Sequence, residues 1–435
     1  MKSSLQPRRG SSSPARQRPA AFERYHALPR LSGQGFLPLG FFARLPLAML
    51  TVGILTLVST VSHSYAIGGL AAGAVGLGSA TGAPIIGYLA DRLGQKNVLL
   101  ASAGTNTVAL VAVVVLCYLA SGFDPGTVIW VLVLSFGSGL TSPQVGPLAR
   151  VRWMFLTRQL PRDDQEATLD TALSYESTAD ELTFVLGPAL VGILASFIAP
   201  WLPLVLAAAL TLTLVSLFAV HRTQEAIPRH APTETGTPTE GGTPAVITGG
   251  LHWFRVAVPV LGMVSMGTFF GATQTALIAF TGSFGSPELG GLLYAVVGLS
   301  SSVAALSVAY WPARFAHPLR WLSAAALMAA LSGLLLLPSS VPAMIVVLLA
   351  LGIPVGPVMV TIFSIGGIVA PRRRLGTVMT ALASGIVAGT ALGSSIAGTL
   401  AQSSGYAAAF LVSMAAAVAL LLLGVLTVVQ MRQPS

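Results

Sequence analysis

The chain has 435 residues, of which 54% are hydrophobic and only 9% are charged. Soluble domains carry about 25% charged residues, so this composition excludes a water-soluble fold. The net charge of +9 does not indicate nucleic acid, because the basic residues lie between apolar stretches and not along one face with interleaved aromatic residues. Only helix bundles and closed barrels span a bilayer, and alternating ten-residue strands are absent from the sequence, so we expect an all-α membrane protein.

Twelve apolar spans follow a basic N-terminal segment. Residues 1–36 lack an apolar core, and we expect a disordered cytoplasmic tail there. The spans, each about as long as hydrocarbon 30 Å thick requires, are 39–62, 65–90, 98–120, 127–149, 172–197, 202–221, 254–280, 288–310, 319–337, 341–369, 377–402 and 406–430. Residues 222–252, rich in Thr, Pro and Gly, predict a flexible cytoplasmic linker. The prediction is two six-helix bundles, 37–221 and 253–430.

The distribution of basic residues supports this count. With the N-terminus in the cytoplasm, the loops on the opposite side contain no lysine or arginine, as the positive-inside rule requires. We therefore expect both termini in the cytoplasm. Arginine outnumbers lysine 21 to 2, which is typical of a GC-rich bacterial genome, so we expect a monomer in the plasma (inner) membrane of a bacterium.

The two halves resemble each other weakly in sequence. Residues 87–94 align with 309–316 at an offset of 222, and residues 167–173 align with 376–382 at an offset of 209. Both matches fall at equivalent cytoplasmic loops of the two halves. Parallel repeats with a central binding site between them are a common plan for transporters.

The most specific motif is Gly87-Tyr-Leu-Ala-Asp91-Arg92-Leu-Gly94-Gln-Lys96, at the junction of the second and third spans. A tight reversal there needs glycine, and Asp91 is placed to face a helix N-terminus or a basic partner. The segment resembles the loop signature of the major facilitator superfamily, Gly-x-Leu-x-Asp-Arg-x-Gly-Arg-Lys, and departs from it mainly at position 95. The resemblance implies the major facilitator fold and a loop that gates transport.

Three acids, Glu176, Asp180 and Glu181, stand at the start of the fifth span. The apolar run after them, residues 182–197, is shorter than a full span, so at least Asp180 and Glu181 should lie within the membrane. Intramembrane carboxylates mark ion pathways and proton relays, and we expect proton coupling here. The alternative is a structural cluster of ion pairs with Arg150 and Arg152.

The matching helix of the second half carries no charge. At the offset of 209, Glu176 corresponds to Gly385 and Asp180 to Gly389, so we expect proton chemistry in the first half and a neutral wall in the second. Within the fifth span, Gly187-Pro188-Ala-Leu-Val-Gly192 resembles the Gly-Pro-x-x-Gly-Gly element of drug–proton antiporters, with its glycine one residue late. This resemblance favours export.

The remaining polar residues give few further candidates. The expected substrate cavity takes residues from spans four, seven and eleven: Gln144, Gln274, Phe269, Phe270, Gly385 and Gly389. His317 falls at a predicted loop, and we expect it to be solvated. The zinc-binding, phosphate-binding and nucleophile-elbow motifs are absent from the sequence. We therefore expect no metal, no cofactor and no enzymatic activity, and transport driven by a gradient.

The function indicated is proton-coupled efflux of a small organic molecule by alternating access. We expect no lysine or arginine deep in the membrane, and hence a neutral or weakly cationic substrate. A proton symporter that imports a sugar or another nutrient is the alternative, because fold does not fix direction. A non-transporting receptor or assembly partner is a further alternative of another class. The expected partners are the substrate, protons and the lipid bilayer, with no nucleic acid.

Overall fold

The computed structural model describes residues 21–120, 122–227, 249–285, 289–312 and 314–432, and over these ranges every regular element is helical. Eleven helical stretches among them are long and apolar enough to cross a bilayer. The last stretch, Leu375–Met431, is interrupted at Gly405, where φ is +82° and only glycine is unstrained. It therefore forms two spans. The predicted twelve-span helical fold is confirmed.

The first half comprises spans one to six, several of which are built from two or more helical segments. These are α2 (Phe36–Phe42) with α3 (Leu45–Ser62), α4 (Tyr65–Leu93), α5 (Gln95–Leu119), α6 (Pro125–Leu140) with α7 (Val145–Thr157), α8 (Arg162–Phe197), and α9 (Leu202–Leu210) continued through the π-helical turn Thr211–Val215 into α10 (Ser216–Val220). The break between α6 and α7 surrounds Pro143, because proline cannot donate to a helical hydrogen bond.

The second half comprises spans seven to twelve. These are α11 (Gly249–Gly282), α12 (Leu289–Ser307), α13 (His317–Ser332), α14 (Val341–Val369) and α15 (Leu375–Arg432), with 3-10 turns at Val308–Tyr310, Gly333–Leu336 and Arg372–Arg374. The predicted spans coincide with these helices, but α7, α8 and α11 are longer than predicted. The additional residues of these three helices lie at the end of the molecule where α10 ends and α11 begins. We call this end the linker end.

Two expectations about the segments outside the bundles need correction. Residues 1–20 lie outside the described residues, but α1 (Ala21–Ser32) is a helix, so the predicted disorder of 1–36 is wrong in its second part. Leu28 of α1 is fully buried, and the hydroxyl of Tyr25 donates to the carbonyl of Leu306 at 2.8 Å. Most of the predicted linker, 228–248, also lies outside the described residues, whereas α11 begins at Gly249, before the predicted boundary.

Within each bundle, helices approach closely through small residues. In the second half, a Cβ on Gly389 of α15 would collide with the α11 backbone at the carbonyl of Val264. In the first half, a Cβ on Gly139 of α6 would collide with the α4 backbone at the carbonyl of Val75. Lipid tails are as apolar as leucine, so membrane helices associate through such close packing and not through the hydrophobic effect.

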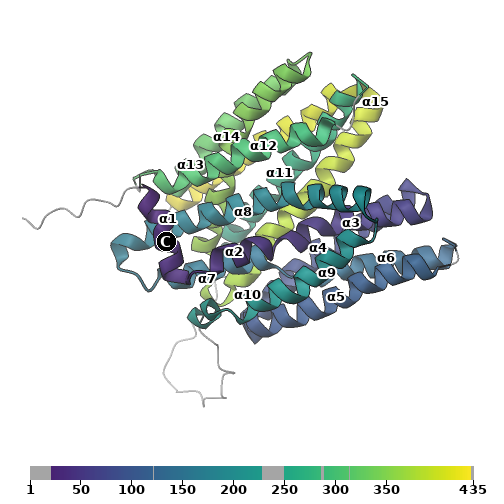
Figure 1. The fold of residues 1–435 in the computed structure, drawn as a ribbon. Coiled ribbons are helices and arrows are strands. Elements are labelled where there is room, and N and C mark those ends of the chain that lie inside the picture. Colours follow the sequence, from purple (N-terminus) through teal and green to yellow (C-terminus); the bar gives the residue numbers. More distant parts are fainter. Residues whose placement is uncertain (1–20, 121, 228–248, 286–288, 313, 433–435) are drawn as a thin grey trace, which may run out of the picture.

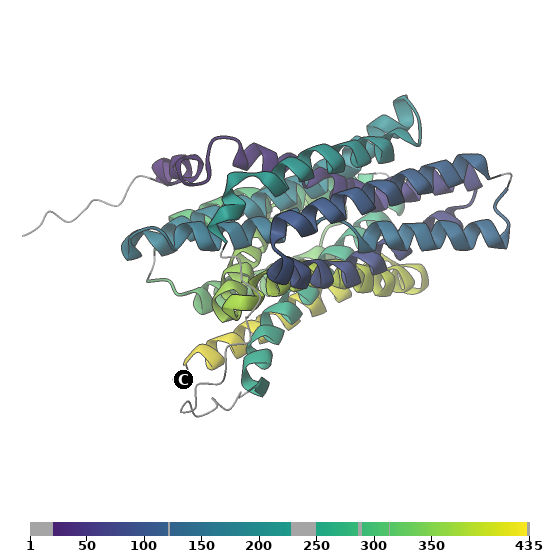
Figure 2. The ribbon, with the colours of Figure 1, turned by 90° about the horizontal axis from the view of Figure 1, so that it is seen from below.

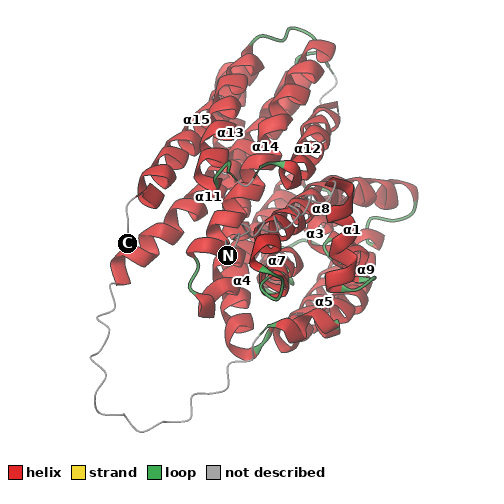
Figure 3. Ribbon diagram, turned by 90° about the vertical axis from the view of Figure 1, so that its left-hand side faces the viewer, coloured by secondary structure: helices red, strands yellow, loops and turns green. Residues whose placement is uncertain are grey.

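The two bundles face each other along α4 with α15 and along α8 with α12. In Figure 1 the two halves diverge with increasing distance from the linker end. Figure 2, from below, shows α1 and the C-terminal end of α15 near the linker end, and Figure 3 looks onto that end, where the two halves form adjacent groups of helices. The bonds that join the bundles gather near the linker end, as described below.

Candidate functional site

The three predicted acids lie on α8, which is longer than its apolar part because residues 162–181 are mostly polar. Glu176 and Asp180 are four residues apart, so they share one face of the helix, and Glu181 is turned by about 100° from Asp180. All three side chains are largely shielded: Glu176 is 1% and Glu181 8% exposed, and Asp180 is partly buried. One helix therefore presents carboxylates to two different surroundings.

Glu176 and Asp180 belong to a cluster of ion pairs with two arginines. Arg44 pairs with Glu176, and its Nε lies 2.9 Å from Asp180 Oδ1. Arg150 Nη2 lies 2.8 Å from Asp180 Oδ2. Trp153 Nε1 donates to Glu176 Oε1 at 2.7 Å. We call Arg44, Arg150, Glu176 and Asp180 the ion-pair cluster; its formal charges cancel.

Arg44 corrects the expectation that no base lies deep in the membrane. It stands between α2 and α3, inside the first span Phe36–Ser62, and is only 5% exposed. The signal was available, because this arginine is flanked by apolar residues on both sides in the sequence. Its presence removes the basis for expecting a neutral or weakly cationic substrate.

The two arginines predicted as charge partners have different surroundings. Arg150 is fully buried, pairs with Asp180 and lies over the ring of Phe363 in α14 at 3.8 Å. Arg152 instead donates to Gln95 Oε1 at 3.0 Å and to the carbonyl of Phe218 at 2.8 Å. Residues 150 and 152 are two apart in a helix and cannot face the same way. Arg152 thus fixes α7 against α5 and α10, and the prediction that it pairs with the acids is wrong.

A cavity opens beside the ion-pair cluster, between the two bundles. Its empty space, open mouth included, is about 740 Å³. The first half contributes α3, α4, α7, α8 and the α6–α7 break, and the second half contributes α14 and α15. The lining residues are Arg44, Leu47, Ala48, Ser79, Ala83, Pro143, Gln144, Val145, Gly146, Pro147, Asp180, Thr183, Phe184, Met359, Phe363, Ala383, Ser384, Ile386 and Val387. Of the predicted site residues, this set includes Asp180 and Gln144.

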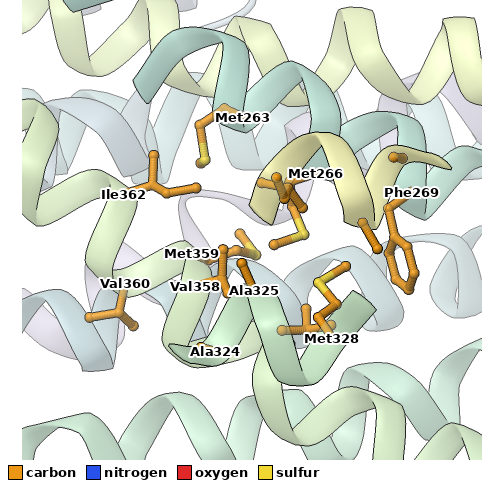
Figure 4. Close-up of a cluster of buried hydrophobic side chains, with 14 of the residues drawn as sticks. Met263, Met266, Phe269, Ala324, Ala325, Met328, Val358, Met359, Val360 and Ile362 are labelled. Atoms are coloured by element: carbon orange, nitrogen blue, oxygen red, sulfur yellow. The ribbon is translucent and has the colours of Figure 1, made fainter. Parts of the chain in front are cut away.

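The other predicted cavity residues lie outside this lining. Phe269 is fully buried in the core of the second bundle, beside Met266 (Figure 4). Phe270 contacts the ring of Tyr294, and Gln274 is exposed. Gly385 and Gly389 pack against the α11 backbone. Small residues on α15 therefore serve helix packing, and their neighbours Ser384, Ile386 and Val387 line the cavity.

Glu181 lies where α8 of the first bundle packs against α12 of the second. We call the contact surface between the two bundles the seam. Its Oε1 accepts from the hydroxyl of Ser301 at 2.7 Å, and its Oε2 lies 3.0 Å from the hydroxyl of Ser302, both on α12. One turn earlier, the hydroxyl of Thr178 lies 3.2 Å from the carbonyl of Ser302. The described part of the chain brings no base to Glu181, so its carboxyl group is held by neutral hydroxyls of the opposite half.

The predicted gating loop joins the bundles at the linker end. Asp91 accepts from the backbone N–H groups of Gly376 and Thr377 at 2.8 and 2.7 Å, and from the Thr377 hydroxyl at 2.8 Å. These groups begin α15, so the carboxylate also faces the positive end of a helix dipole. Gly87 lies against the start of α15, where a Cβ would collide with the hydroxyl of Thr380.

The remaining residues of the loop have simpler positions. Gly94 has φ +87°, which permits the reversal between α4 and α5. Arg92 and Lys96 are exposed, and the Arg92 guanidinium lies 4.9 Å from the centre of the Tyr88 ring. Gln95, where the motif departs from the family pattern, is buried and holds Arg152. The residue that departs from the family pattern thus has a structural role.

The predicted helix-five element lies in the half of α8 that is farther from the linker end, and it comprises Gly187, Pro188 and Gly192. A Cβ on Gly187 would collide with Ala48 of α3, so this glycine allows α3 and α8 to approach closely. Gly192 has no neighbour within 4 Å of its Cβ position. Pro188 lies inside the helix, which continues to Phe197. The element therefore allows α8 to pack against α3 beside the cavity residue Ala48.

A second charged bridge between the bundles was missed by the sequence analysis. Arg320 Nη1 of α13 lies 2.6 Å from Asp170 Oδ2 of α8, and His317 Nε2 lies 3.2 Å from Asp170 Oδ1. His317 is therefore not a solvated loop residue. Its side chain is 13% exposed. Only the spatial proximity of α8 and α13 shows this bridge, which no spacing in the sequence indicates.

The arrangement can serve as a hinged pair of bundles with a site between them. Asp91, Asp170 and Glu181 each bond across the seam, and all three bonds would break if the bundles separated at the linker end. The cavity lies at the inner edge of this seam and carries both charges and apolar surface. Such a seam with a cavity between the two bundles suits alternating access.

Comparison with known proteins agrees with this reading of the fold. The model of the Major Facilitator Superfamily matches residues 36–381. Among solved structures, the chain is similar to the human organic anion transporter MFSD10, with TM-score 0.63 and 17% identity over 94% of this chain and 100% of that chain. A bacterial homologue of the iron transporter ferroportin in its outward-facing state gives TM-score 0.67 and 14% identity over 93% and 100%.

A third similar structure is the transporter FucP in its outward conformation, with TM-score 0.60 and 14% identity over 90% of this chain and 98% of that chain. Comparison with curated protein sequences gave no match. Identities this low show the shared fold alone, whereas the family model covers most of the sequence. The chain is therefore a multi-pass membrane protein that belongs to the Major Facilitator Superfamily of transporters.

Proposed function

We propose that the protein is a proton-coupled secondary transporter that exports a small organic molecule across the bacterial plasma membrane by alternating access. The linker end faces the cytoplasm, in accord with the distribution of basic residues. The observation that carries the proposal is Glu181, a carboxyl group buried in the seam between the bundles and held by Ser301 and Ser302 of the opposite half.

Glu181 is the coupling acid among the three candidates. Glu176 and Asp180 are each compensated by an arginine, so a proton there would compete with Arg44 or Arg150. Glu181 has only hydroxyl partners. A charge buried without a counter-ion is costly, so closure of the seam goes with protonation of Glu181, and opening at the linker end exposes it to the cytoplasm, where it releases the proton.

The hydroxyl of Ser302 supports this protonation state. It lies 2.8 Å from the carbonyl of Gly298 as well as 3.0 Å from Glu181 Oε2. A serine hydroxyl has one proton to donate but two lone pairs to accept. If it donates to Gly298, its contact with Glu181 is a hydrogen bond only when Glu181 is the donor. A protonated Glu181 thus satisfies every group in this network.

The cavity beside the ion-pair cluster is the proposed substrate site. It is lined from both bundles, and rocking of the bundles about it would expose it to either side in turn. Two similar structures are in outward states, which agrees with bonds between the bundles gathered at the linker end here. The direction of export rests on the resemblance of the Gly187-Pro188 element to that of drug–proton antiporters.

The test is flux in liposomes that contain the purified full chain and a pH-sensitive dye. An imposed pH gradient should drive proton movement that depends on an added substrate from a panel of drugs, dyes, carboxylates and sugars. Glu181→Gln keeps the bonds to Ser301 and Ser302 but cannot carry a proton, and should abolish movement driven by the gradient while substrate exchange at equal pH remains. Glu166→Gln, an exposed change on the same helix, is the control.

The result that would contradict the proposal is gradient-driven flux that persists in Glu181→Gln at the rate of the control. Flux of the substrate in the same direction as the protons would retain the coupling but replace export by import.

A further inference from the structure

Among the described helices, α1 is the one that precedes the first span. The chain reverses behind it at Gly33, which has φ +94°, and the Gly33 N–H donates to the carbonyl of Pro29 at 2.8 Å. A left-handed glycine of this kind ends a helix and fixes the direction in which the chain leaves it. In Figure 1, α1 lies at the linker end and runs across the direction of α2. It is therefore a separate element placed across the end of the molecule.

The first bundle anchors α1 through Leu28. This side chain is 0% exposed and belongs to an apolar cluster whose other members all come from the first half, among them Phe36, Trp153 and Phe218. Leu31 packs against the same cluster. Burial of a leucine side chain is among the larger stabilising contributions that one residue makes. We therefore expect α1 to remain with the first bundle when the two bundles move relative to each other.

The second bundle contacts α1 through Tyr25. The Tyr25 hydroxyl donates to the carbonyl of Leu306 in α12 at 2.8 Å, and the centre of its ring lies 6.2 Å from that of Tyr310. Leu306 lies in the last turn of α12, where carbonyl groups lack a donor within their own helix. The tyrosine supplies such a donor, and aromatic rings at this separation attract each other. One side chain of α1 thus makes two contacts with the second half.

The two contact residues lie on the same face of α1. Tyr25 and Leu28 are three residues apart, and residues at this spacing are neighbours on a helix surface. The helix packs against α8 of the first bundle and against the turn Val308–Tyr310 of the second. The face that carries Tyr25 and Leu28 therefore lies over the seam, with one residue on each bundle.

We propose that α1 is a strap that crosses the seam at the linker end and stabilises the state in which this end is closed. Separation of the bundles there would carry Leu306 and Tyr310 away from α1, which remains with the first bundle. Both contacts of Tyr25 would then break. Their loss is a cost of opening, so the strap shifts the population toward molecules that are closed at the linker end.

The strap differs in position from the bonds of Asp91, Asp170 and Glu181. Those three residues belong to the bundles themselves, whereas α1 lies outside the spans, and the cavity lining includes none of residues 25–32. The strap therefore sets the fraction of closed molecules without contacting the proposed substrate site. This inference goes beyond the proposed function, because a strap acts in the same way whatever the substrate is and whichever ion drives transport.

The experiment measures how fast a cysteine hidden in the seam reacts with N-ethylmaleimide in the purified full chain. Thr380→Cys places this cysteine in α15, where residue 380 is 0% exposed and its side chain faces Gly87 of α4 across the seam. The native Cys117 is first replaced by serine. The reagent reaches position 380 only when the linker end opens, so the rate reports the open fraction. No substrate or gradient is needed.

Tyr25→Phe removes the bond to Leu306 but keeps the ring. It should speed the reaction about 2- to 10-fold, the change expected for one neutral hydrogen bond. Tyr25→Ala also removes the ring contact with Tyr310 and should speed the reaction further. Leu28→Ala loosens the anchor on the first bundle, and should raise the rate above that of the unchanged strap as well.

Tyr175→Phe is the matched control, because the Tyr175 hydroxyl donates to the carbonyl of Leu37 at the same distance, 2.8 Å, within the first half. It removes an equivalent bond that does not cross the seam, and should leave the rate at position 380 unchanged. A second control uses chains that keep Cys117, which is buried in the core of the first bundle. Tyr25→Phe should not change the rate at this cysteine.

Rates at position 380 in Tyr25→Phe and Tyr25→Ala that equal the rate in Tyr175→Phe would overturn the proposal. So would an equal acceleration at Cys117, because α1 would then stabilise the fold of the first bundle and not the closed seam. Neither result bears on proton coupling through Glu181, which is measured by proton movement in liposomes.

Discussion

Replacement of Asp91 by asparagine should open the linker end. The carboxylate accepts three hydrogen bonds from the first residues of α15, Gly376 and Thr377, at 2.7 to 2.8 Å. Asparagine offers one acceptor oxygen, and its NH2 group would face N–H donors. Hydrogen bonds to a charged group contribute about 1.5–3 kcal/mol, and the helix dipole adds about 0.3–1 kcal/mol. A net loss of about 2 kcal/mol from the closed state is a conservative figure.

Such a loss changes the ratio of closed to open molecules about 30-fold, since 1.4 kcal/mol corresponds to a factor of ten. A closed population of about 99% would then fall to about 80%. This change can be detected by pulsed electron paramagnetic resonance, which measures the distance between two spin labels. The labels are attached at Lys96 of the first half and Leu319 of the second, both of which are exposed. The buried Cys117 is first replaced by serine. Asp91→Asn should add a population at longer distance.

Arg92→Gln is the matched control, because Arg92 is adjacent, charged and exposed but contacts Tyr88 of its own helix. It should leave the distance distribution as in the wild type. An Asp91→Asn distribution that coincides with that of the control would refute the argument that the bonds of Asp91 to α15 hold the linker end closed.

Three further predictions concern packing, capping and the second bridge. Gly389→Ala should cost about 1–3 kcal/mol by overpacking against α11 and lower the melting temperature, whereas Gly398→Ala, whose nearest neighbour is 3.8 Å away, should not. Hydrogen bonds from the side chain and backbone of Thr127 lower the pKa of Asp124 from its ordinary value of 3.8. This contribution to stability is present above that value and lost as the pH falls through the lowered pKa, so the melting-temperature difference between wild type and Asp124→Asn should vanish in acid. Arg320→Gln removes the arginine partner of Asp170, a buried carboxylate of α8, and should lengthen the same spin-label distance; an unchanged distance would show that this bridge does not hold the bundles together.

Much of the fold followed from composition, because the bilayer imposes simple rules. Apolar runs of the right length predict helices, and the loops without arginine or lysine predict their threading. The exceptions are local. The helical break at Pro143 and the extension of α7 to Thr157 place Arg150 inside the bundle, and a hydropathy pattern does not register such a break.

The site was predictable in kind but less so in its partners. The acids of α8 stood out because charges are rare in the spans, and Asp180 does line the cavity. Which arginine meets which acid depends on helix rotation, and so Arg150 pairs with Asp180 while Arg152 turns toward Gln95. Arg44 is the one charged residue of the first span, Phe36–Ser62, and an isolated charge of this kind indicates a buried partner, as the acids of α8 do.

The neighbouring positions of Asp180 and Glu181 bear on how coupling works. The two carboxyl groups are adjacent in sequence but about 100° apart around α8, so one faces the cavity and the arginines while the other faces α12 across the seam. Any tilt or rotation of α8 relative to α12 that frees Glu181 also moves Asp180 relative to Arg150. Coupling between proton and substrate then needs no long chain of contacts, because a single rigid element is biased by both. Loss of coupling should therefore follow from changes that uncouple α8 from α12, such as Ser301→Ala with Ser302→Ala, even though both acids remain.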